Sequence, residues 1–122
     1  MSVTPVALPA EPSEAAARLR ALSLTQPVLV FKKSPICPVS HHAEAQLRQW
    51  IAALPQGLEV FVAEIDVIAE RTLARGLTAA LDVRHESPQA LWFAAGALAW
   101  HGSHDRLTVE RFDSLLAGGC HE

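Results

Sequence analysis

The chain has 122 residues, a formal net charge of −3 and a hydrophobic fraction of 50%. This length fits one globular domain, and the hydrophobic fraction excludes an intrinsically disordered chain. The acidic balance, with two lysines in all, is a poor electrostatic match for DNA or RNA, so we expect no nucleic-acid partner.

The N-terminal segment, residues 1–12, carries three prolines among small residues, and we predict a loose tail there. It lacks the basic start and apolar stretch of a signal peptide. The domain is predicted over residues 13–117, and residues 118–122 are predicted to form a C-terminal tail. A short helix should open the domain, because apolar residues repeat at helical spacing over residues 14–22.

Two buried strands enclose the next predicted helix. An apolar run without alternation, residues 28–32, predicts a strand that is covered on both faces. An apolar stripe at i, i+4, i+7, i+8 and i+11 then predicts a helix that begins after Cys37 and ends at Pro55. The second buried strand is predicted over residues 60–65.

The rest of the chain predicts a helix, a hairpin and a final helix. The first helix lies around residues 73–81, and a glycine-containing turn at residues 94–96 predicts the hairpin. The final helix should begin after Thr108 or Asp105, either of which can cap it. This order predicts an α/β fold with a mixed four-stranded sheet and helices on both faces. The longest apolar run, residues 90–100, is too short to span a bilayer, so we expect no membrane partner.

Cys37 carries the strongest chemical signal. Pro38 fits the first position of a helix, which makes Cys37 the predicted N-cap. Free backbone N–H groups and the positive end of the helix dipole there favour the thiolate over the thiol. Ser40 stands where a second cysteine often resolves such a thiol, so the motif is C-x-x-S. The alternative is an inert cysteine in a turn.

The cysteine count bears on the compartment. A chain with two cysteines and no export signal is expected in a reducing cytoplasm, where a reactive thiol is more plausible than a structural disulfide. Cys120 is either a resolving thiol for Cys37 or an incidental tail residue, and we favour the second interpretation.

Several polar residues near these segments have open roles. Lys32 and Lys33 precede Cys37 and are expected to add positive potential at the sulfur. His41 could relay protons for Cys37, but a solvent-facing position is favoured. His101 and His104 have a spacing that occurs in metal sites, yet no convincing third ligand accompanies them, and no metal is predicted.

Four short segments carry a resemblance to a known family. In chain order they are Phe31-Lys32 followed by Cys37-Pro38-Val39-Ser40, then Asp66-Val67-Ile68, His85-Glu86-Ser87-Pro88-Gln89 and Trp100-His101-Gly102-Ser103-His104. Together they resemble the YtxJ-type monothiol bacilliredoxin (BrxC) family, thioredoxin-like proteins of bacteria that use bacillithiol. The resemblance spans residues 28–112. The usual form of the family has a basic residue where this chain has Ile36.

The resemblance implies a mechanism. It implies a thioredoxin-like fold in which Pro88 is cis and faces Cys37, while the backbone of Ser87 pairs with the substrate. Cys37 would attack a mixed disulfide between bacillithiol and a protein, with its thiolate stabilised by Ser40, Pro38 and Lys32. The implied partners are bacillithiolated proteins and bacillithiol or a similar low-molecular-weight thiol. No cofactor is implied besides bacillithiol as co-substrate.

Two other functions stay open at this point. One is a non-catalytic thioredoxin-fold stress protein that senses oxidants through Cys37. The other is an iron–sulfur carrier, because related C-x-x-S glutaredoxins can hold a cluster together with small thiols.

Overall fold

The computed structural model describes residues 5–118. Its elements are α1 (Pro12–Leu22), β1 (Val28–Lys33), α2 (Pro38–Ala52), β2 (Phe61–Asp66), α3 (Arg71–Ala80), β3 (Gln89–Ala94), β4 (Ala97–Ser103), the 3-10 helix η1 (His104–Arg106) and α4 (Val109–Leu116). None of the helices in this described part combines the length and the apolar character that crossing a membrane requires.

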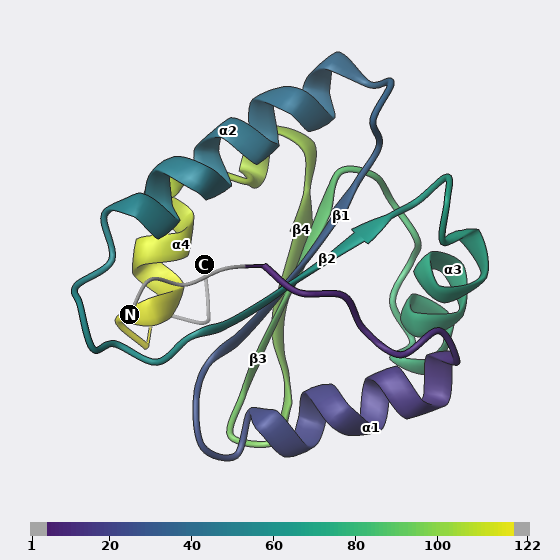
Figure 1. Ribbon diagram of the computed structural model, residues 1–122, viewed down its shortest axis with the longest axis horizontal. Helices are drawn as coiled ribbons and strands as arrows, with labels where there is room; N and C mark the ends of the chain where they lie inside the picture. The colour runs from purple at the N-terminus through teal and green to yellow at the C-terminus, as the bar shows by residue number, and fades with distance from the viewer. Residues whose placement is uncertain (1–4, 119–122) are drawn as a thin grey trace.

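A mixed sheet with the strand order β2-β1-β3-β4 lies at the centre of the molecule (Figure 1). Strand β1 pairs in parallel with β2 and antiparallel with β3, and β4 is antiparallel to β3. Helices α2 and α4 cover one face of the sheet, and α1 and α3 cover the other (Figure 1). The predicted α/β architecture, with four strands and helices on both faces, is therefore confirmed.

The alternation of side chains along β1 divides the interior into two cores. Val28 and Val30 belong to the core under α1 and α3, whereas Leu29 and Phe31 belong to the core under α2 and α4. All four side chains are fully buried. The absence of polar alternation in this run thus follows from burial on both faces of the strand, as predicted.

Aromatic rings dominate the core under α2 and α4. The Trp50 ring on α2 lies 6.2 Å from the Trp92 ring and 5.5 Å from the Phe112 ring, measured between centroids. Thr108, one of the two predicted caps, is the N-cap of α4, and its side chain accepts a hydrogen bond from the amide of Arg111. Asp105, the other candidate, lies within η1.

The turn between β3 and β4 has the backbone that a tight hairpin requires. Ala95 and Gly96 have φ values of 55° and 86°. Two successive positive φ values match the twist of the flanking strands, and glycine adopts such a φ without steric cost. The predicted hairpin is confirmed.

The N-terminal segment differs from the loose tail predicted for it. Val6 forms a parallel bridge to Ala63, donating its amide to the carbonyl of Val62 and accepting from the amide of Glu64, both at 3.0 Å. Leu8 is buried and packs in the core under α1 and α3. Strand β2 is an edge strand, and its free backbone groups supply the bonding partners for this segment.

We predict that Gly76→Ala lowers the stability of the protein. Alanine in a helix usually adds about 1 kcal/mol relative to glycine. At this position of α3, however, a new Cβ would lie 2.4 Å from Cγ of Pro12 on α1. We expect a net loss of about 1–3 kcal/mol in the free energy of unfolding, measured by urea denaturation.

The double variant Gly76→Ala, Pro12→Ala tests the cause of this loss. It removes the atom at 2.4 Å and leaves Cβ of residue 12 at 2.9 Å, so stability should return in part. A Gly76→Ala protein as stable as the parent would show that α1 and α3 do not approach each other this closely.

Candidate functional site

Cys37 occupies the junction between β1 and α2. It is the N-cap of α2, with φ −101° and ψ 120°, and Pro38 is the first residue of the helix. The side chain of Cys37 is partly exposed and makes no capping hydrogen bond. The predicted N-cap is confirmed, and its sulfur lies beside the helix N-terminus without being tied to the helix amides.

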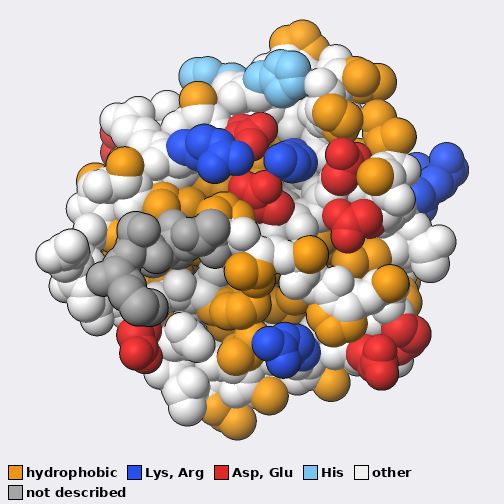
Figure 2. Space-filling view, in the orientation of Figure 1, with side chains coloured by type: hydrophobic (Ala, Val, Ile, Leu, Met, Phe, Trp, Pro, Cys, Tyr) orange, Lys and Arg blue, Asp and Glu red, His pale blue; other side chains and the backbone are white. Residues whose placement is uncertain are grey.

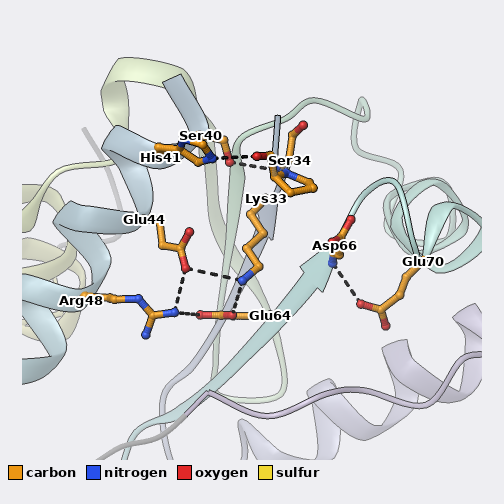
Figure 3. A network of polar contacts seen from close by, with 10 residues as sticks. Lys33, Ser34, Ser40, His41, Glu44, Arg48, Glu64, Asp66 and Glu70 are labelled. Carbon is orange, nitrogen blue, oxygen red and sulfur yellow. Dashed lines mark hydrogen bonds and ion pairs between the residues drawn. The ribbon is translucent and has the colours of Figure 1, made fainter. Parts of the chain in front are cut away.

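Ser40 fixes the backbone of the loop that carries Cys37. Its side chain is fully buried, and its Oγ accepts a hydrogen bond from the amide of Ser34 at 2.8 Å (Figure 3). A hydroxyl that accepts one hydrogen bond keeps its own hydrogen for a second bond. Ser40 therefore holds the loop from the helix side and still has a donor to offer.

His41 makes a second bond across the same loop. Its Nε2 lies 2.8 Å from the carbonyl oxygen of Pro35, and because a carbonyl only accepts, Nε2 carries the hydrogen (Figure 3). Both His41 and His42 are exposed, as the favoured interpretation expected. Ser40 and His41 together tie the residues before Cys37 to the first turn of α2.

Lys33 belongs to a network of four charges that joins β1, β2 and α2 (Figure 3). Its Nζ lies 3.0 Å from Glu64 and 3.5 Å from Glu44, and Arg48 lies 2.7 Å and 3.7 Å from Glu44 and Glu64. Basic and acidic side chains lie side by side on this face of the molecule (Figure 2). The hydrogen bond to Glu64 raises the pKa of Lys33. Two carboxylates thus balance the charge that was expected to act on the sulfur.

Lys32 has partners other than Cys37. It stands two residues after Val30, so alternation places its side chain on the α1 and α3 side of the sheet, opposite to α2. Its Nζ donates to Oε1 of Gln89 at 2.8 Å and lies 2.7 Å from Nδ1 of His85. Burial lowers the pKa of Lys32 to about 7. These contacts give no support to the expected stabilisation of the thiolate by Lys32.

The loop before β3 lies at the same end of the sheet as Cys37. The antiparallel register pairs Lys32 with Gln89, so the end of β1 lies beside the beginning of β3. The Ser87–Pro88 peptide bond is cis, the configuration that the resemblance implied. The Oγ atom of Ser87 is buried and has no hydrogen-bond partner among the described residues.

The other candidates from the sequence are His101, His104 and Cys120. His101 lies on β4, and His104 belongs to η1, where its φ is 57°. Within residues 5–118 no three His, Cys, Asp or Glu side chains are grouped so that they could hold a metal ion. Cys120 lies outside the described residues, so its predicted role remains a prediction.

His85 and Gln89 were predicted only as parts of a resembling segment, and neither was assigned a role at the site. A signal for them was present, because Lys32 interrupts an apolar strand that is buried on both faces. A buried charge needs hydrogen-bonding partners, so such a lysine predicts polar side chains on the neighbouring strand. Their positions in the chain could not be derived without the register of β1 against β3.

Comparisons with known proteins agree on the fold. A family model described as monothiol bacilliredoxin BrxC matches residues 10–112. A solved structure described as having a thioredoxin fold is 26% identical, covers 78% of this chain and 81% of its own, and has a TM-score of 0.67. A thioredoxin variant from Halobacterium salinarum NRC-1 is 18% identical, covers 100% and 96%, and also has a TM-score of 0.67. Thioredoxin O2 from Arabidopsis thaliana is 17% identical, covers 96% and 97%, and has a TM-score of 0.66. The fold is thioredoxin-like.

Proposed function

The chain belongs to the monothiol bacilliredoxin BrxC family, whose members are thioredoxin-like thiol redox proteins, and we propose that Cys37 takes bacillithiol from protein mixed disulfides. The observation that carries the proposal is the position of Cys37 at the N-cap of α2, partly exposed and free of a capping bond. A thiol in this position can be reached by a mixed disulfide and is not engaged by the helix amides.

The exchange proceeds in two balanced steps. The Cys37 thiolate attacks the bacillithiol sulfur of the mixed disulfide; a new disulfide forms between Cys37 and bacillithiol, and the target protein leaves as a thiolate that water protonates. A second thiol then attacks this disulfide. If free bacillithiol attacks the bacillithiol sulfur, bacillithiol disulfide forms and Cys37 leaves as the thiolate. If a dithiol partner attacks that sulfur, Cys37 leaves as the thiolate and the partner carries bacillithiol; the partner's second thiol then displaces bacillithiol as a free thiol, and the partner ends as a disulfide.

Ser40 accounts for the monothiol character in this proposal. A hydroxyl cannot form a disulfide, so the adduct on Cys37 cannot be resolved within the C-x-x-S motif and waits for an external thiol. Ser40 is instead buried and bonded to the Ser34 amide, which makes it part of the loop that carries Cys37.

A protein substrate suits the surroundings of Cys37. The apolar side chains of Ile36 and Val39 flank it with 79% and 44% of their surface exposed, and a protein substrate would cover both. The Ser87 backbone at the same end of the sheet would pair with an extended segment of the target, as a short added strand.

Mass spectrometry of the intact protein and its peptides tests the proposal. After incubation with oxidised bacillithiol we expect one adduct on Cys37, which reduced bacillithiol removes, and catalytic turnover of a bacillithiolated protein substrate. An unmodified Cys37 would contradict the proposal. A Cys37–Cys120 disulfide would contradict the monothiol description.

The same samples separate the two alternative functions. Stoichiometric modification of Cys37 without turnover would indicate a sensor. A brown purified protein with a cluster absorption band would indicate an iron–sulfur carrier.

A further inference from the structure

Two buried side chains hold three consecutive residues of the loop before β3. The Oε1 atom of Gln89 accepts from the amide of Glu86 at 3.3 Å, and its Nε2 donates to the carbonyl of Arg84 at 2.9 Å. Lys32 lies 2.7 Å from the ring nitrogen Nδ1 of His85. The bond from Lys32 to Oε1 of Gln89 joins these contacts into one cluster.

The protonation of this cluster follows from its contacts. When Lys32 is protonated its ammonium has only donors, so Nδ1 of His85 then accepts, and the neutral imidazole carries its hydrogen on Nε2. Burial, followed by the charge of Lys32, lowers the pKa of His85, which agrees with a neutral ring. Arg75 on α3 and Glu86 in the loop are the other charges that act on Lys32.

Burying this cluster lowers the free energy gained on folding. Lys32 and Gln89 are 0% and 1% exposed. Removing an ammonium from water costs several kcal/mol, and an apolar residue at the same strand position would often be as stable or more so. A buried lysine here is therefore poorly explained by the stability of β1.

The loop is also held on its other side, by the end of β4. The amide of His104 donates to the carbonyl of Pro88 at 3.1 Å, and the Ser103 hydroxyl donates to the Glu86 carboxylate. Along the chain, the Ser87–Pro88 peptide follows residues 84–86, which Lys32 on β1 and Gln89 on β3 contact, and the Pro88 carbonyl is bonded to the first residue of η1. The loop, residues 84–88, is thus fixed on both sides at the end of the sheet that carries Cys37.

We propose that Lys32 is a positioning residue of this loop: through Gln89 and His85 it holds the Ser87 backbone where a protein substrate pairs, and it does not act on the Cys37 thiolate. This role rests on the proposed function, because it assigns Lys32 to the binding of the same substrate. It replaces the role that the position of Lys32 in the sequence had suggested.

Steady-state kinetics of Lys32→Met test the proposal. Methionine keeps an unbranched apolar stem and removes the donors. We expect KM for a bacillithiolated protein to rise about tenfold and kcat to stay within about twofold of the parent value. The hydrogen bonds that are lost help to position the substrate and take no part in the chemical step. The pH midpoint of Cys37 alkylation by iodoacetamide should stay where it is in the parent protein.

Lys33→Met is the matched control, because it removes a neighbouring lysine that contacts Glu44 and Glu64 instead of the loop. Its KM should equal that of the parent. If Lys32→Met does not fold, His85→Leu replaces it, because this variant removes the Lys32–His85 hydrogen bond and keeps the Lys32–Gln89 bond. We expect its KM to rise about threefold.

Hydrogen exchange separates this proposal from the proposed function. In Lys32→Met the amides of residues 84–87 should exchange faster than in the parent, whether or not the protein turns over a mixed disulfide. Unchanged exchange, unchanged KM, or a shifted alkylation midpoint would each overturn the positioning role. If the parent protein shows no turnover, the proposed function is overturned. The hydrogen-exchange rates of the loop amides then decide by themselves whether Lys32 holds the loop.

Discussion

Cys37→Ser is expected to abolish thiol–disulfide exchange while leaving the protein folded. A serine hydroxyl cannot form the mixed disulfide, so turnover should fall by a factor on the order of 10³ or more. The substitution removes little packing, because Cys37 is partly exposed. Serine is moreover a favourable N-cap, and its hydroxyl can accept the helix amide bond that the sulfur does not make, which should stabilise the protein by up to about 1 kcal/mol.

Two measurements check this result together. Turnover of a bacillithiolated protein reports the chemistry, and urea denaturation reports the free energy of unfolding. Cys120→Ser is the matched control and should keep full turnover if Cys37 acts as a monothiol. If Cys37→Ser keeps thiol–disulfide exchange, another residue must carry out the reaction. If Cys120→Ser loses it, Cys120 acts as a resolving thiol.

Phe112→Ala should destabilise the protein by about 3–5 kcal/mol. The Phe112 side chain is fully buried, and its ring lies 5.5 Å from the Trp50 ring. Helix α4 has 8 residues, too few to be stable in isolation, so its docking onto α2 depends on this contact. A domain of this size has a total stability of about 5–15 kcal/mol, so the loss should be a large share of it.

Urea denaturation followed by tryptophan fluorescence measures this loss, and native emission should shift to the red as Trp50 gains water contact. Glu110→Ala is the control on the same helix, because Glu110 is exposed and the change should stay within about 0.5 kcal/mol. Equal stability of Phe112→Ala and the parent would show that α4 is not held by the aromatic cluster.

Features set by neighbouring residues were predicted from the sequence. The Cys37-Pro38 pair defines the start of α2, because proline fits the first helical position and the capping residue precedes it. Gly96 predicted the hairpin through its freedom to adopt a positive φ. The apolar stripe of α2 predicted a buried face, and Trp50 lies on it.

Features that depend on pairing between distant segments were predicted less well. Val6 attaches to Ala63 on β2, and nothing within residues 1–12 indicates that partner. Lys32 was assigned to the thiol because it lies close to Cys37 in sequence. Alternation from Val30 would have placed Lys32 on the opposite face, but its partner Gln89 is 57 residues away and required the register of β1 against β3.

This separation in sequence has a consequence for the newly made chain. Gln89 follows Cys37 by 52 residues. At the usual rate of about 5–20 residues per second, about 3–10 s pass on the ribosome between the synthesis of Cys37 and that of the segment that completes this end of the sheet. During that interval the cysteine is an open thiol on an unfinished polypeptide, exposed to the same oxidants whose products the finished protein is proposed to repair.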